Sequence, residues 1–138
     1  MSTTPRTLHR PVVAAPINTG RVAVVTAAAL ALNLIALWIG GASGASLETN
    51  APEPINALTV TITTLVVLIG GSTALGPISR RWSNVRNWAP TAGLAVGAVT
   101  MVMPFFAADD AKTGATLAAM HLITGLAWFG ALRPSKAE

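Results

Sequence analysis

Four polar side chains interrupt otherwise apolar stretches and are the residues best able to do chemistry: Asn33, Thr64, Thr100 and His121. An amide, two hydroxyls and an imidazole all form hydrogen bonds, and a neutral imidazole can also bind a ligand or change its charge near neutral pH. Two interpretations remain open. Either these side chains bond one another or nearby carbonyls and fix helix packing, or His121 is the centre of a small binding site.

The residue types that are absent exclude or disfavour several other chemistries. The chain has no cysteine, which rules out disulfides, thiol redox chemistry and Cys-ligated metals. The apolar stretches contain no Asp or Glu that could complete a proton relay with His121. A haem would need His121 together with Met101, Met103 or a second copy of the same histidine. We therefore expect no enzymatic activity, no cofactor and no metal.

The elements that position these residues are four stretches without Asp, Glu, Lys or Arg, at 22–47, 54–79, 87–108 and 113–132. Each reaches the roughly 20 residues that a helix needs to cross a bilayer. Charged residues make up 10% of the chain, against about 25% in a typical soluble domain. Short loops make consecutive helices antiparallel neighbours. The sequence therefore predicts an all-α fold, a transmembrane up-down antiparallel four-helix bundle.

Proline and glycine indicate the helix ends. We expect Gly76-Pro77 to end the second helix, Pro90 to lie in the first turn of the third, and Pro104 to kink or end that helix near Ala107. The expected helices, within a transmembrane domain of residues 21–133, are 22–41, 57–76, 89–108 and 113–132.

Small residues at helical spacing accompany three of the polar side chains. The faces are Thr26, Ala29, Asn33, Ala36 and Gly40 on the first helix, Gly93, Gly97, Thr100 and Pro104 on the third, and Gly114, Ala118, His121 and Gly125 on the fourth. Small residues let helix backbones approach closely in lipid. The four polar residues also lie at similar distances from one end of their helices, which predicts one polar layer facing protein.

Basic residues predict the orientation. All Lys and Arg residues except Lys112 precede the first stretch, follow the fourth, or lie between the second and third. By the positive-inside rule this side is cytoplasmic, so we expect a plasma-membrane protein with both termini in the cytoplasm. Residues 1–20 and 134–138 are expected to be cytoplasmic tails, the first of them flexible. The alternative, signal-peptide cleavage after Ala45, requires a shorter apolar region of about 7 to 15 residues.

Membrane-surface contacts are expected near the segment ends. Tryptophans there are typical of an interfacial belt, and the chain has Trp38, Trp82, Trp88 and Trp128 in such positions. Anionic lipid headgroups are expected partners of Arg80, Arg81 and Arg86. The basic residues flank apolar segments instead of forming a stripe with interleaved aromatics, so no nucleic-acid partner is expected.

The second half of the chain carries a family resemblance. The run from Trp88-Ala-Pro-Thr to Met103-Pro104, the short polar loop after it and the Met120-His121-Leu122 triplet resemble an uncharacterised family of small four-helix actinobacterial membrane proteins, a domain of unknown function. The resemblance covers residues 22–133 in layout and the second half in motif. It implies a four-helix plasma-membrane protein and supplies no activity, substrate or cofactor.

Two functions are therefore open. The first is a protein that acts through packing, as a homo-oligomer or an accessory subunit of a membrane complex. The alternative is a transporter or a lipid- or small-ligand-binding protein that uses the polar layer around His121. A membrane enzyme is not expected, because no pair of catalytic groups faces one compartment.

Overall fold

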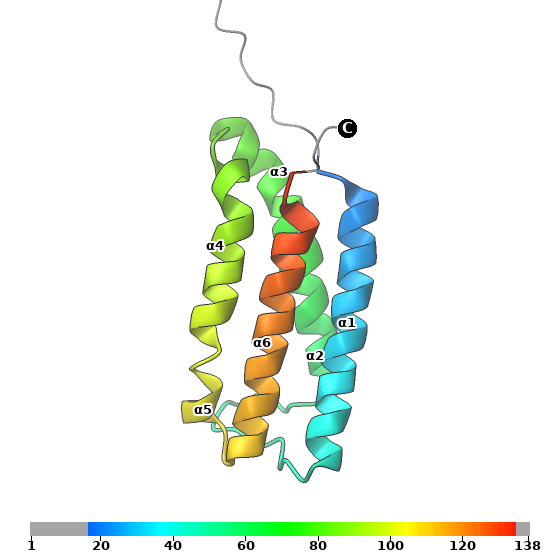
Figure 1. Cartoon of the computed structure of the whole chain (residues 1–138), viewed down its shortest axis with the longest axis vertical. Coiled ribbons are helices and arrows are strands. Elements are labelled where there is room, and N and C mark those ends of the chain that lie inside the picture. The colour runs from blue at the N-terminus through cyan, green and yellow to red at the C-terminus, as the bar shows by residue number, and fades with distance from the viewer. Residues whose placement is uncertain (1–16, 135–138) are drawn as a thin grey trace, which may run out of the picture.

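The computed structural model describes residues 17–134, which form four long helices and the loops that connect them (Figure 1). In chain order the elements are α1 (Thr19–Ala42), α2 (Ala57–Leu65), the π-helix η1 (Val66–Gly70), α3 (Gly71–Arg81), α4 (Val85–Thr100), α5 (Pro104–Ala107) and α6 (Ala111–Leu132). The second long helix combines α2, η1 and α3, and the third combines α4 and α5.

All four helices are long and apolar enough to cross a membrane. The expected all-helical class is confirmed for residues 17–134, which contain no strand. Predictions that concern residues 1–16 and 135–138, including most of the N-terminal tail, lie outside the described residues.

Side-chain caps explain where three of the helices begin. Asn18, Asn56 and Asp110 each accept hydrogen bonds of 2.8 to 3.0 Å from backbone N–H groups in the first turn of α1, α2 and α6. These N–H groups have no partner within the helix, so a capping side chain stabilises the helix start. The cap at Asn18 begins α1 at Thr19, slightly earlier than predicted.

Glycine ends α1. Gly44 has a φ of +86°, a conformation that glycine adopts without steric cost. The N–H of Ala45 donates to the carbonyl of Gly40, and the N–H of Gly44 donates to the carbonyl of Gly41, both at 3.0 Å. This pairing is a Schellman motif, which satisfies the last carbonyls of the helix.

The predicted end of the second helix was wrong. Instead of ending at Gly76-Pro77, α3 continues to Arg81 with Pro77 inside it. Proline removes one backbone donor, but its φ matches the helical value, and membrane helices tolerate such a loss. Because the helix continues past Pro77, Arg80 and Arg81 lie in its last turn, beyond its apolar part.

The third helix is interrupted at Pro104, as predicted. α4 ends at Thr100, and α5 runs from Pro104 to Ala107. Pro104 has no N–H to donate to the carbonyl of Thr100. That carbonyl instead accepts from the N–H of Met103 at 3.2 Å, which tightens the chain into a turn.

The predicted start of the third helix was wrong. α4 begins at Val85, so Pro90 lies inside the helix and not in its first turn. The N–H groups of Val85 and Asn87 donate to the carbonyls of Trp82 and Asn84 at 3.0 and 3.1 Å. Each of these hydrogen bonds joins residues three positions apart. They continue the connecting turn directly into the helix, so the helix begins earlier than predicted.

The packing order of the helices differs from their order in the chain. α6 packs against α4, α5 and α1, and α1 packs against α2. The second helix meets α4 mainly through α3, close to their connecting turn (Figure 1). Consequently α1 and α6 are packed on both sides, whereas α2 and α4 each have one side without an extensive helix contact.

The predicted small-residue faces lie at helix contacts. A Cβ atom on Gly97 of α4 would lie 2.8 Å from the Cα of Gly125 on α6. A Cβ atom on Gly40 of α1 would lie 2.5 Å from Thr116 Oγ1 of α6. Such distances exclude larger residues, so these glycines set how closely the helices approach.

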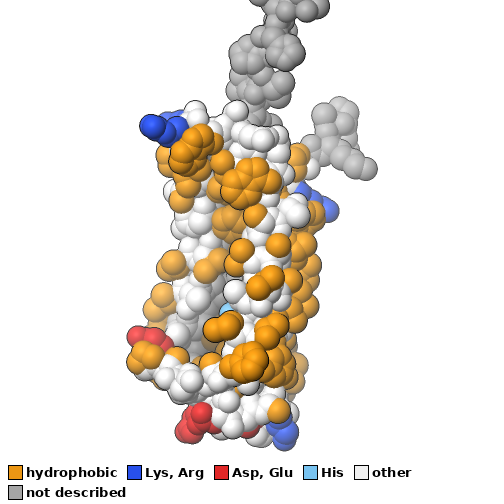
Figure 2. All heavy atoms as spheres, turned by 90° about the vertical axis from the view of Figure 1, so that its left-hand side faces the viewer, with side chains coloured by type: hydrophobic (Ala, Val, Ile, Leu, Met, Phe, Trp, Pro, Cys, Tyr) orange, Lys and Arg blue, Asp and Glu red, His pale blue; other side chains and the backbone are white. Residues whose placement is uncertain are grey.

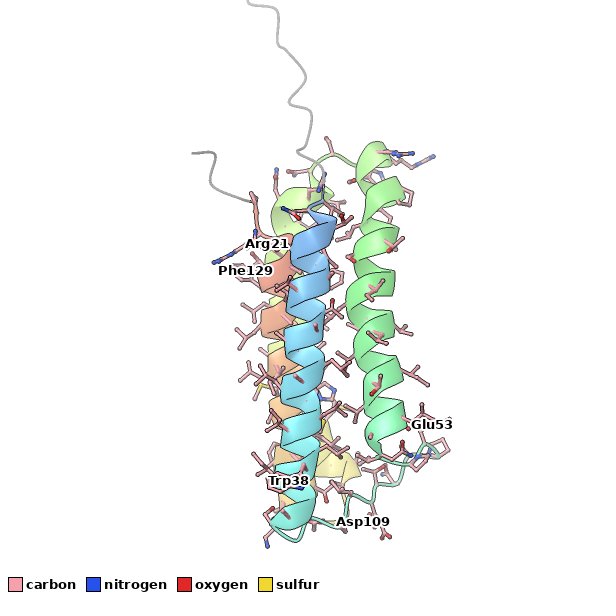
Figure 3. The ribbon with its side chains drawn as sticks, turned by 90° about the vertical axis from the view of Figure 1, so that its right-hand side faces the viewer. Arg21, Trp38, Glu53, Asp109 and Phe129 are labelled. Atoms are coloured by element: carbon pink, nitrogen blue, oxygen red, sulfur yellow. The ribbon has the colours of Figure 1, made fainter. Side chains whose placement is uncertain are left out.

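Charged side chains lie at the two ends of the helices. Figure 3 shows Arg21 at one end, and Glu53 and Asp109 at the other. We call these the basic end and the acidic end. Figure 2 shows a broad region without charged side chains between them on the face it presents. This distribution is typical of a protein whose middle lies in the hydrocarbon core of a bilayer and whose two ends lie in water.

Asp110 joins the loops at the acidic end. Its Oδ2 accepts from Ser46 Oγ and Thr113 Oγ1, each at 2.6 Å, and from the Ser46 N–H at 3.0 Å. These bonds, with the Ser46 hydroxyl first in importance, hold the pKa of the Asp110 carboxyl well below its usual range. The charged carboxylate therefore links the loop after α1 to the start of α6.

Candidate functional site

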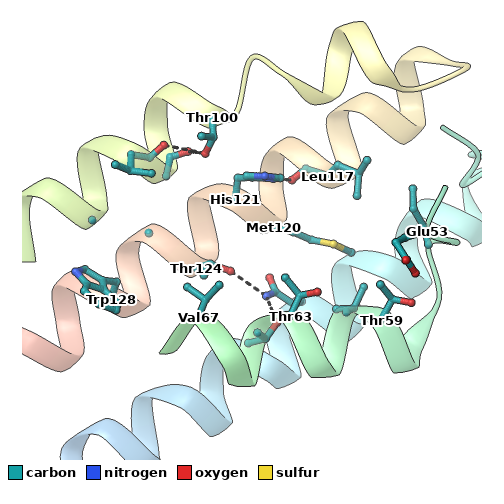
Figure 4. A pocket seen from close by; sticks show the side chains of 18 of the residues that line it. Glu53, Thr59, Thr63, Val67, Thr100, Leu117, Met120, His121, Thr124 and Trp128 are labelled. Carbon is teal, nitrogen blue, oxygen red and sulfur yellow. Dashed lines mark hydrogen bonds between the residues drawn. The ribbon is translucent and has the colours of Figure 1, made fainter. Parts of the chain in front are cut away.

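A cavity of about 490 Å³ lies between the second helix and α4, with α6 and α1 behind it (Figure 4). Its volume is typical of small-molecule sites, which range from about 300 to 1,000 Å³. Figure 2 shows the surface hollowed between columns of apolar side chains. The cavity follows from the packing order, because the second helix and α4 have no extensive contact there.

Asn33 forms the polar centre of the cavity wall. Its Nδ2 donates to Thr64 Oγ1 at 3.0 Å and to Thr124 Oγ1 at 3.2 Å, so one side chain connects α1, α2 and α6. Asn33 is only 2% exposed. Its Oδ1 is buried without a hydrogen-bond partner among the described residues, which leaves one unsatisfied acceptor in an apolar environment.

Thr124 was not among the predicted site residues. It lies three positions after His121 and directly before Gly125, and was not part of the predicted small-residue face of the fourth helix. Residues three positions apart in a helix are neighbours on its surface, so a search for hydroxyls beside His121 would have found it. Its role depends on the contact with Asn33, which only the folded structure reveals.

His121 lines the cavity but bonds its own helix. Its Nδ1 lies 2.8 Å from the carbonyl oxygen of Leu117. A carbonyl can only accept, so Nδ1 carries a proton in this bond, and the other ring nitrogen, Nε2, is an acceptor when the imidazole is neutral. Figure 4 shows the imidazole alongside α6 and the cavity. The ring therefore lines the cavity with Nδ1 already used inside α6.

Thr100 lines the same cavity from α4. Its hydroxyl donates within its own helix, with Oγ1 at 2.8 Å from the Val96 carbonyl and 3.2 Å from the Gly97 carbonyl. The structure thus brings all four predicted residues to one cavity, but only Asn33 and Thr64 bond each other.

Trp128 closes the cavity toward the basic end and packs between helices. Its Nε1 donates to the Ala89 carbonyl of α4 at 2.8 Å. A Cβ atom on Gly93 would lie 2.0 Å from the indole ring, and one on Gly71 of α3 would lie 2.5 Å from it. The absence of side chains at both glycines makes room for the ring between the second and third helices. The other three tryptophans, Trp38, Trp82 and Trp88, are exposed.

The opposite end of the cavity is lined by Glu53, Pro54 and Ile55, just before α2. Figure 4 shows Glu53 at this end and Trp128 at the other. Glu53 is the charged residue of the lining, which is otherwise neutral and mostly apolar. The residues of the site therefore favour shape matching and hydrogen bonding over ion pairing.

No group of His, Asp or Glu in residues 17–134 is arranged to hold a metal ion. The site combines an apolar chamber with Asn33, whose buried Oδ1 has no hydrogen-bond partner among the described residues, and with the imidazole of His121 and several threonine side chains. Such a site can bind an apolar molecule and orient a polar group on it.

The fold and the cavity define a small membrane protein with four candidate spans and a ligand-sized chamber among them. The chain belongs to the family of unknown function DUF6069, whose family model matches residues 13–138. Comparisons with curated proteins and with solved structures found no match.

Proposed function

We propose that this protein binds a lipid or another hydrophobic small molecule in the cavity between the second helix and α4, and that it does so without enzymatic activity. The observation that carries the proposal is the 490 Å³ cavity with Asn33 at its wall. A lipid or apolar solute can enter such a chamber from the membrane. Storage, transport and presentation of the bound molecule all begin with this binding step.

The membrane arrangement belongs to the same proposal. We place the four helices as an up-down antiparallel bundle in the plasma membrane, with both termini in the cytoplasm. The separation of a basic end from an acidic end supports this orientation. Anionic headgroups at Arg80, Arg81 and Arg86 are expected partners at the cytoplasmic surface.

Cysteine labelling tests the orientation, since the chain has no native cysteine. We expect a single Ser43→Cys variant to react with a membrane-impermeant maleimide on intact cells, and a Ser83→Cys variant to react only after lysis. Both positions are exposed in the structure, so accessibility of the side chain does not limit either reaction. Labelling of Ser83→Cys alone on intact cells would reverse the orientation.

A cavity-filling substitution tests the binding function. Val67 lines the cavity, whereas its neighbour Val66 does not and is 63% exposed. We expect Val67→Trp to reduce the amount of co-purified ligand at least tenfold in native mass spectrometry from mild detergent, because the indole occupies the ligand's volume.

The matched control is Val66→Trp, which places the same side chain on the outer surface and should retain the ligand. If no stoichiometric ligand accompanies the unaltered protein, or if both variants keep it equally, the binding proposal fails.

A role as a homo-oligomer or accessory subunit is the second candidate. The observation in its favour is a run of exposed apolar side chains around the interruption of the third helix: Val99, Val102, Met103, Phe105 and Phe106. Lipid can cover the same surface. A defined oligomer or protein partner without a small ligand in the same native spectra would favour this candidate.

A further inference from the structure

Asn33, which lines the cavity, has an unused hydrogen-bond acceptor and no unused donor on its amide. Both bonds of Asn33 Nδ2 go to threonine hydroxyls, while Oδ1 is buried without a partner. The Nδ1–H of His121 is used by the Leu117 carbonyl, so in the neutral imidazole Nε2 is an acceptor as well. An unsatisfied acceptor in an apolar site is costly, so a ligand that donates a hydrogen bond there relieves that cost.

The lining also selects against negative charge. No Lys or Arg lines the cavity, and Glu53 lies at its acidic end. A carboxylate or phosphate placed inside would lose its hydration without gaining a cation. A fatty-acid anion or a phosphorylated headgroup therefore does not fit the interior.

We propose that the ligand is a neutral amphiphile with a hydroxyl group, which donates a hydrogen bond to Asn33 Oδ1 while its hydrocarbon part fills the apolar chamber. This inference rests on the proposed binding function and names the class of its ligand. Long-chain alcohols and other hydroxyl-bearing neutral lipids share this chemistry. The hydroxyl completes the bonding of the amide that connects α1, α2 and α6, so binding also stabilises the junction of these helices.

Tryptophan fluorescence can report occupancy because Trp128 lines the cavity. In a protein with Trp38, Trp82 and Trp88 replaced by phenylalanine, Trp128 is the remaining tryptophan. In phosphatidylcholine nanodiscs, dodecanol carrying a terminal bromine should quench it saturably. Unlabelled dodecanol, dodecyl methyl ether and dodecanoate then compete for the site, with concentrations corrected for partitioning into the bilayer.

We expect dodecanol to compete about tenfold better than the ether, since the ether cannot donate the hydrogen bond, and dodecanoate to compete least. In Asn33→Leu the alcohol and the ether should become equal. The control is Thr26→Val on the same helix. Its hydroxyl is also buried without a partner but does not line the cavity, so this variant should keep the preference.

The outcomes separate the two proposals. If none of the three compounds displaces the quencher, the binding function itself fails. If the ether or dodecanoate competes as well as the alcohol in the unaltered pocket, the binding function stands and the hydroxyl inference is overturned. This comparison holds even if Asn33→Leu does not fold. If the preference is lost in His121→Phe but kept in Asn33→Leu, the assignment to Asn33 is overturned.

Discussion

Replacement of Gly97 with leucine is expected to separate α4 from α6 and to lower the free energy of unfolding by about 3 kcal/mol or more. Even a Cβ atom at this position would lie 2.8 Å from the Cα of Gly125 and 3.0 Å from the carbonyl oxygen of His121. Both contacts are with backbone, which cannot rotate away as a side chain can. Equilibrium unfolding of the purified protein in bicelles titrated with SDS measures the loss.

Gly70→Leu is the matched control. It introduces the same side chain into a long helix at a glycine with no atom within 4 Å of the added Cβ. We expect a change within about 0.5 kcal/mol, as for a typical surface substitution. Equal destabilisation by the two variants would show that the α4–α6 contact does not limit stability.

Replacement of Trp128 with alanine is expected to cost about 3 kcal/mol and to open the cavity toward the basic end. The indole occupies the space left by Gly71 and Gly93, and it is hydrogen-bonded to Ala89. Alanine removes the packing with both neighbouring helices together with this bond. Unfolding in the same bicelles gives the loss of stability, and entry of a water-soluble quencher into the cavity gives the opening.

Two further variants separate the contribution of the Trp128 hydrogen bond from that of ring packing, and compare Trp128 with an exposed tryptophan. Trp128→Phe keeps most of the ring packing and should cost about 1 kcal/mol, the contribution of a typical hydrogen bond. Trp88→Ala removes a tryptophan that is 53% exposed and should cost far less than Trp128→Ala. If Trp88→Ala costs as much, interfacial anchoring and not cavity closure is the main contribution of the tryptophans.

Local chemistry made much of the helical layout predictable. The apolar stretches are as long as a membrane crossing requires, and the ends of the four long helices lie within about five residues of the predicted ones. The interruption at Pro104 was predicted because a missing N–H acts on the residues beside it. The prediction that the second helix ends at Pro77 was wrong, because proline weakens a helix locally but the surroundings decide whether the helix continues.

The candidate site was predictable only in part. Asn33, Thr64, Thr100 and His121 were chosen as polar residues in apolar stretches, and all four line the cavity. Thr124 was missed because a threonine in a helix commonly bonds its own backbone, and nothing in the sequence distinguishes one that receives a bond from another helix.

The sequence by itself determined the apolar lengths, the distribution of charge and the small-residue faces, because each depends on residue type and spacing along one helix. Only the tertiary structure decided that α6 packs between α1 and α4, and that the second helix remains apart from α4 along most of its length. Helical periodicity defines which face is packed but not which helix packs against it. The cavity, the closing role of Trp128 and the unpaired oxygen of Asn33 all follow from that choice of partners.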